Sequence, residues 1–198
     1  MQLRKKLKAL KKRLVRMIRE NVDNSDDALI RRIERGDKAA MRVLYERHSN
    51  GLTAFARNRL KDPFEAADVV QETFLEVWTK ASTFEARASV RSWMFSIARN
   101  KAVDRIRKSA KVIASEPDET IVDDGPAVET IVSNAQDAER VQHCLSELSD
   151  AQRAAVTLSF FEEMTYREIA ETESVSESTV KSRIHYAKKL LMHCLSKP

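Results

Sequence analysis

The sequence is poor in the residues that interrupt regular structure. Its 198 residues include 3 Gly and 4 Pro, while 42% are hydrophobic and 33% are charged. So few helix breakers, combined with many Ala, Leu, Glu, Lys and Arg, favour an all-α fold. The length allows one or two small domains, each with a modest core.

Cysteine and long apolar runs are scarce as well. Cys144 and Cys194 are too few for the disulfide framework of a small secreted domain, so a reducing cytoplasm is the expected environment. No stretch approaches the roughly 18 apolar residues that a membrane span needs. The basic N-terminus lacks the apolar h-region of a secretory signal. We therefore expect a cytoplasmic protein with no transmembrane segment.

Sequence patterns typical of catalysis are also missing. There is no Gly-rich phosphate loop, nucleophile elbow or HExxH pattern, so we expect no enzyme, no cofactor and no small-molecule substrate. Two matching dipeptides, His143-Cys144 and His193-Cys194, could in principle supply four zinc ligands. Adjacent residues on a helix point about 100° apart, which makes such a site awkward. Ordinary half-buried residues are the favoured interpretation, and no metal site is predicted.

The positive charge is concentrated at the N-terminus. Residues 1–20 hold nine Lys or Arg and one Glu, a charge of +8, so the rest of the chain sums to −3 of the total +5. Leucines at helical spacing predict a basic amphipathic helix, which we assign to an extension at 1–21. It could bind other macromolecules, lie on an anionic membrane surface, fold against the next domain, or remain a solvated, partly disordered extension.

Helical periodicity predicts a first domain over 22–110. We expect one helix after Asp26 that stops at Gly36, and a longer one capped by Asp37 and running toward Leu60. Gly51 weakens the middle of that helix by about 1 kcal/mol, so a bend there is possible. Asp62-Pro63 opens a third helix. A fourth follows the loop 82–89 and ends near Lys108.

Periodicity then disappears over 111–137. This segment has one basic and seven acidic residues together with Pro117, Gly125 and Pro126, which predicts a flexible acidic linker. Four further helices fit a second domain at 138–198. They cover about 138–148, then from the Ser149 cap to near Phe161, from the Thr165-x-x-Glu168 capping box, and from Ser176 to about Leu195.

The segment TYREIAETESVSESTVKSR (165–183) has helix-turn-helix spacing. Ala170 lets the two helices approach closely, although the turn has Glu173-Ser174 where Gly is common. The second helix opens with short hydroxyls and cations, the groups that contact phosphates and base edges in a major groove. A helical hairpin with a merely solvated charged face is the alternative.

Three motifs together resemble the sigma-70 family of transcription initiation factors, in its small extracytoplasmic-function type. TYREIAE with VSESTVKSRIHYAKKLL resembles the helix-turn-helix that binds the minus-35 element. DVVQETFLEVW (68–78) resembles the helix that binds the clamp of the polymerase's largest subunit. SWMFSIARNKAVDRIRK (92–108) resembles the helix that opens the minus-10 element. The three occur in the family's order and are separated by an acidic linker.

The resemblance implies a role for each matching residue. Trp93 is expected in the core rather than as a stacking platform. The basic extension at 1–21 could contact DNA or polymerase. The linker could thread through basic polymerase channels or be a plain tether. Polymerase contacts are expected from Asp68, Gln71, Glu72, Phe74 and Leu75. Minus-10 contacts are expected from Phe84, Glu85, Arg87, Ser89, Arg91, Arg99, Asn100, Lys101, Asp104 and Arg105. Minus-35 contacts are expected from Ser176, Glu177, Ser178, Thr179, Lys181, Ser182, Arg183 and Tyr186.

The sequence therefore predicts two small helical domains that bind core RNA polymerase and promoter DNA. The second domain is also expected to touch the polymerase flap, and the family resemblance implies an anti-sigma factor as a further partner. Two other functions stay open. A conventional helix-turn-helix regulator would bind duplex DNA alone, usually as a dimer. A helical adaptor that sequesters a regulator would keep the fold without promoter activity.

Overall fold

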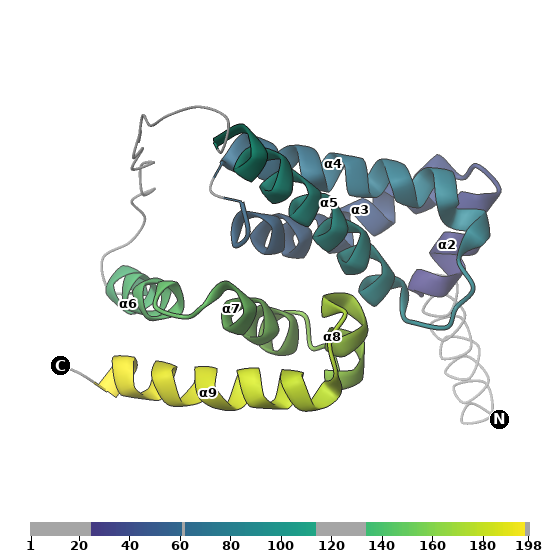
Figure 1. The fold of residues 1–198 in the computed structure, drawn as a ribbon. Helices are drawn as coiled ribbons and strands as arrows, with labels where there is room; N and C mark the ends of the chain where they lie inside the picture. Colours follow the sequence, from purple (N-terminus) through teal and green to yellow (C-terminus); the bar gives the residue numbers. More distant parts are fainter. Residues whose placement is uncertain (1–24, 61, 114–133, 197–198) are drawn as a thin grey trace, which may run out of the picture.

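The computed structural model of the chain describes residues 25–60, 62–113 and 134–196 (Figure 1). Within these ranges the chain is helical without strands, and it forms two small domains, at residues 26–113 and 134–196. The extension at 1–21 and most of the linker predicted at 111–137 lie outside them. No helix in the described ranges is long and apolar enough to cross a membrane.

The first two helices begin at capping side chains. Helix α2 (Asp26–Glu34) starts after Ser25, whose hydroxyl accepts a backbone N–H of the first turn at 3.3 Å. The chain reverses at Gly36, which has a φ of 81° that suits glycine. Asp37 then caps α3 (Lys38–Arg57), as predicted. Helix α3 continues through Gly51 without a break.

The next two helices complete the first domain. Asp62 caps α4 (Pro63–Lys80) and Pro63 occupies its first turn, which confirms the predicted restart. A short turn, η1 (Ala81–Thr83), leads to α5 (Val90–Ile113). Because α5 extends past Lys108, residues 111–113 belong to a helix and not to the linker.

The second domain contains four helices and one π-helical turn. Helix α6 (Asn134–Ser146) starts four residues before the predicted position. Helix α7 (Asp150–Val156) is followed by the π-helical turn η2 (Thr157–Phe161). Helices α8 (Tyr166–Glu173) and α9 (Glu177–Ser196) complete the domain. In Figure 1, α9 runs below α6, α7 and α8, and α2–α5 lie above them.

One hydrophobic core joins the two domains. Helix α5 packs against α8, and the same buried cluster contains Leu44, Phe55 and Phe95 of the first domain and Leu158 and Ile169 of the second. Burial of large apolar side chains stabilises each by about 1.5–3 kcal/mol relative to exposure. The domains are therefore held together by apolar packing as well as by polar contacts.

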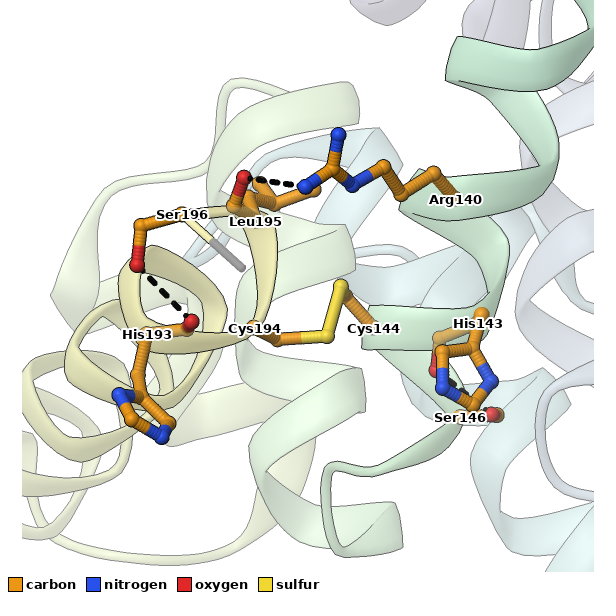
Figure 2. The surroundings of a disulfide bond; sticks show 8 residues. All are labelled: Arg140, His143, Cys144, Ser146, His193, Cys194, Leu195 and Ser196. Atoms are coloured by element: carbon orange, nitrogen blue, oxygen red, sulfur yellow. Dashed lines mark hydrogen bonds between the residues drawn. A yellow bond between two sulfur atoms is a disulfide. The ribbon is translucent and has the colours of Figure 1, made fainter. Parts of the chain in front are cut away.

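The two cysteines are not the ordinary half-buried residues that the sequence suggested. Cys144 of α6 and Cys194 of α9 form a disulfide, with their Cα atoms 5.7 Å apart (Figure 2). The disulfide removes both sulfur atoms as zinc ligands, and the rings of His143 and His193 lie on either side of it. No group of three or more metal-ligating side chains occurs in the described part of the chain.

Candidate nucleic-acid and polymerase interfaces

Helices α8 and α9 form the predicted helix-turn-helix. Thr165 and Glu168 make the predicted capping box: the Thr165 hydroxyl accepts the Glu168 N–H at 3.3 Å, and the Glu168 carboxylate accepts the Thr165 N–H at 2.9 Å. Ser174 ends α8 in the left-handed conformation, with φ 54°, where glycine is usual. Buried Ile169 and Ile184 fix the two helices together.

The start of α9 presents a polar surface. Ser176 caps the helix, because its hydroxyl accepts the N–H of Thr179 at 3.2 Å. Lys181 is exposed, Arg183 is half-buried, and Tyr186 is exposed further along the helix. The other predicted residues here, Glu177, Ser178 and Ser182, are exposed as well. Cations and hydroxyls at an exposed helix N-terminus are the groups that contact DNA phosphates and base edges.

One face of α4 is exposed and carries most of the predicted polymerase contacts. Asp68, Gln71, Glu72 and Leu75 follow helical spacing, and Leu75 is 63% exposed despite being apolar. Phe74 does not belong to this face. It is 5% exposed, and its ring lies 4.7 Å from that of Tyr45, so its side chain packs inside the first domain, and its contact with a partner stays a prediction.

Ion pairs join this face of α4 to α5. Arg105 contacts Glu72 at 2.5 Å and Asp68 at 3.6 Å, and Lys101 contacts Glu76 at 2.9 Å. Hydrogen bonds from Lys80 and Lys101 hold the pKa of Glu76 below its usual value. Two cations expected to hold DNA are thus already paired within the first domain.

The loop before α5 is held by an aromatic pair. Phe84 and Trp93 are both half-buried, with ring centroids 5.0 Å apart, and both pack on the core. This contact supports a core role for Trp93. Glu85 and Arg87 are exposed and pair with each other at 2.7 Å. On α5, Asn100 and Asp104 are exposed, and Arg99 donates to the side chain of Asn100 at 3.2 Å.

Two segments of the chain match two regions of a known protein family. Residues 44–112, which include α4 and nearly all of α5, match sigma-70 region 2. Residues 138–191, which contain the helix-turn-helix, match region 4 of the same family. The chain belongs to the sigma-70 family. It is a sigma factor, and the sigma-70 fold accounts for both helical domains.

Relatives of this sigma factor cover most of its length. It is 31% identical to the ECF RNA polymerase sigma factor SigK of Mycobacterium bovis (strain BCG / Pasteur 1173P2), over 85% of this chain and 92% of that protein. The structure of CnrH in complex with the cytosolic domain of CnrY is 26% identical with a TM-score of 0.61, covering 86% of this chain and 96% of CnrH. RpoE of Bartonella quintana, solved with the anti-sigma factor NepR, is 23% identical with a TM-score of 0.57 and covers 77% of this chain and 96% of that one. This last likeness concerns the fold alone.

Two residues predicted for minus-10 recognition contact the second domain of the sigma factor. Ser89 donates a hydrogen bond to the Glu168 carboxylate at 2.6 Å, and Arg91 donates to the backbone carbonyl of Glu162. Burial opposes ionisation of Glu168, but hydrogen bonds from Ser89 and Thr165 leave its pKa below the usual value. These contacts place the start of α5 against the second domain.

Three structural features were not predicted from the sequence. Phe64 is 81% exposed and lies four residues before Asp68, on the same face of α4. This helical spacing could have placed Phe64 on the predicted polymerase-binding face. Glu76 pairs with Lys101, which helical spacing alone does not indicate. Gly51 lies where the Glu162 side chain crosses α3, because an added Cβ would approach its Cδ to 2.8 Å. Burial raises the pKa of that Glu162 carboxyl.

Proposed function

We propose that this sigma factor is of the extracytoplasmic-function type and acts in the cytoplasm without catalytic activity of its own. It binds core RNA polymerase through the exposed face of α4, opens the minus-10 element with α5 and its preceding loop, and binds minus-35 duplex with the start of α9. The observation that carries the proposal is the exposed polar surface at the start of α9, on the second helix of a helix-turn-helix. Its hydroxyls and cations fit a major groove.

The α4 face fits a basic protein partner. Asp68, Gln71 and Glu72 present carboxylates and an amide, and exposed Leu75 adds apolar area. Acidic and amide groups around an exposed apolar residue suit an interface with a cationic helical surface. We assign this face to the polymerase and leave Phe74 out of it.

An anti-sigma factor is the proposed regulatory partner. CnrH was solved with a bound protein, the cytosolic domain of CnrY, and this chain shares the fold of CnrH over most of its length. Co-purification with a candidate partner and loss of transcription when the partner is added test this part of the proposal.

Run-off transcription tests the function. Purified core polymerase, this protein and a promoter library should give transcripts whose start sites follow a shared two-part element. Leu75→Glu should weaken core binding at least tenfold, whereas Ala39→Glu, at an exposed position of α3, should not. Duplex binding without core-dependent transcription would instead support a conventional regulator, and loss of both would support an adaptor.

A further inference from the structure

A polar cavity of about 230 Å³ lies where the end of α3 meets α6 and α7. Among the described residues, its lining contains three guanidinium groups and one carboxylate. Arg57 ends α3 and Arg59 follows it, whereas Asp150 and Arg153 belong to α7. Positive charge therefore exceeds negative charge around this cavity. None of these residues belongs to the surfaces assigned above to the polymerase or to promoter DNA.

Arg59 is a buried cation whose hydrogen bonding is incomplete. Its side chain is 10% exposed, and its guanidinium lies 3.8 Å from the ring centroid of Phe55. One nitrogen, Nη2, donates to the carboxylate of Glu173, but Nη1 is buried and has no hydrogen-bond partner within the described residues. Burial lowers the pKa of Arg59, and the charge of Glu173 offsets this only in part. Buried donors are ordinarily met by a partner, whether a protein group, a water molecule or an ion.

The carboxylate in the lining is already paired. Asp150 accepts a hydrogen bond from Arg153, which also donates to the backbone carbonyl of Asn58 at 3.3 Å and so connects α7 to the end of α3. Arg57 is exposed and has no ion-pair partner in the part of the chain that the structure describes. The positive charge of Arg57 and part of that of Arg59 are thus left without a compensating carboxylate.

A neutral donor from the second domain lies on the same cavity. Gln142 and Ser146 of α6 both line it, four residues apart on one face of that helix. The Ser146 hydroxyl already donates to the carbonyl of His143 at 2.7 Å, so the carboxamide of Gln142 is the donor that remains. Guanidinium groups bind phosphate oxygens through pairs of parallel hydrogen bonds. The cavity is smaller than the roughly 300–1,000 Å³ of pockets for drug-sized ligands, so it fits a small ligand.

We infer that this cavity binds a small anion that carries a phosphate or pyrophosphate group. Arg57 and Arg153 hold its oxygens, Gln142 adds a neutral hydrogen bond, and Arg59 supplies further positive charge. Because Arg57 and Arg59 belong to the first domain and Gln142 and Arg153 to the second, the anion contacts both. It therefore stabilises the folded protein, since a ligand that binds only the folded chain opposes unfolding. Binding requires neither core polymerase nor promoter DNA, so the inference stands apart from the proposed function.

Titration calorimetry of the full-length protein with pyrophosphate tests the site. One pyrophosphate should bind per chain, and Arg57→Gln should weaken binding about tenfold, as expected when a charge-assisted contact is lost. Arg35→Gln is the matched control, because Arg35 is also exposed at the end of a helix but does not line the cavity. Gln142→Ala should weaken binding about threefold, since it removes a neutral hydrogen bond. Equal affinities of the wild type and Arg57→Gln would overturn the inference.

Hydrogen exchange locates the bound anion independently of these variants. Pyrophosphate should slow exchange at residues 57–60 and 142–146, whereas sodium chloride at the same ionic strength should not. The basic extension supplies the contrasting outcome, because its nine cations can also attract phosphate. If neutral substitutions within residues 1–20 abolished binding while Arg57→Gln had no effect, the anion would bind the extension, and the cavity would not be its site. Inorganic phosphate and a phosphomonoester, titrated in the same way, then distinguish the free ion from a phosphorylated metabolite.

Discussion

Helices α5 and α9 are both assigned to promoter DNA, yet the fold leaves them in different states. At the start of α9, exposed Lys181 has no ion-pair partner within the described residues. On α5, Lys101 and Arg105 are paired with carboxylates of α4. Ser89, just before α5, and Arg91, in its first turn, donate hydrogen bonds to the second domain. The cations of a helix can therefore bind DNA phosphates only where they are not already paired with carboxylates of the same protein.

The largest expected effect is a loss of stability when the disulfide that anchors α9 is removed. The Cys144–Cys194 disulfide ties the far end of α9 to α6 and closes a loop of 50 residues in sequence separation. Loop-closure entropy of this size corresponds to about 4 kcal/mol as an upper value. Cys144→Ser/Cys194→Ser should lower the free energy of unfolding by up to this amount, measured by urea unfolding. Reductant should affect the wild type and leave the serine variant unchanged; an unchanged wild-type midpoint after reduction would contradict a stabilising disulfide.

The difference between the cations of the two helices can be measured next. Lys181→Ala should weaken promoter binding about fivefold and reduce the salt slope by about 1, because an unpaired cation releases a counterion when it meets a phosphate. Lys101→Ala should cost less than about twofold, since Lys101 is paired with Glu76. Fluorescence anisotropy over a salt series gives both values. Equal losses of affinity in the two variants would show that intramolecular ion pairs do not determine which lysines bind DNA.

A smaller gain is expected when a cation of α5 is released. Glu76→Gln removes the carboxylate that Lys101 contacts at 2.9 Å and should raise affinity for single-stranded DNA about twofold. Exposed ion pairs contribute about 1 kcal/mol or less, which bounds the effect. Glu46→Gln is a matched control, because Glu46 forms an exposed ion pair with Arg42 of the same helix, α3, and not with a residue of α5. Unchanged affinity would mean that Lys101 does not reach DNA.

The smallest effect concerns pH and α2. Burial opposes ionisation of Asp26, but hydrogen bonds and charge from His48 and Arg47 hold its pKa below the ordinary value of 3.8. Because the folded pKa is lower than the unfolded one, Asp26 adds stability above the unfolded pKa, and this is lost as pH falls through the folded pKa. Asp26→Asn should therefore flatten the loss of stability between neutral pH and about pH 3. If the free energy of unfolding of both proteins changed identically with pH, Asp26 would not contribute to the acid sensitivity of the fold.

Local signals predicted the helices well. The caps at Asp37, Asp62-Pro63 and Thr165 are confirmed, because each depends on residues within three or four positions. Ser174 replaces the expected glycine by adopting the left-handed conformation itself. The spacing that places Asp68 and Leu75 on one face also holds.

Contacts between distant residues were not predictable from local signals. Phe74 fits a helical stripe with Leu75, yet it packs on Tyr45 of another helix. Arg59 and Glu173 are 114 residues apart and carry no periodic signal of their pairing. The disulfide depends on how α6 and α9 pack, which the sequence positions of the two cysteines do not indicate.

Footprinting on one promoter, with the sigma factor alone and with core polymerase, tests the central claim most directly. Nuclease protection reports the minus-35 duplex, and permanganate reactivity of thymines reports melting at minus-10. With core polymerase, we predict minus-35 protection together with reactive minus-10 thymines. The sigma factor alone should leave the minus-10 thymines unreactive. Reactive minus-10 thymines with the sigma factor alone, or no protection of either element with core polymerase, would contradict the account.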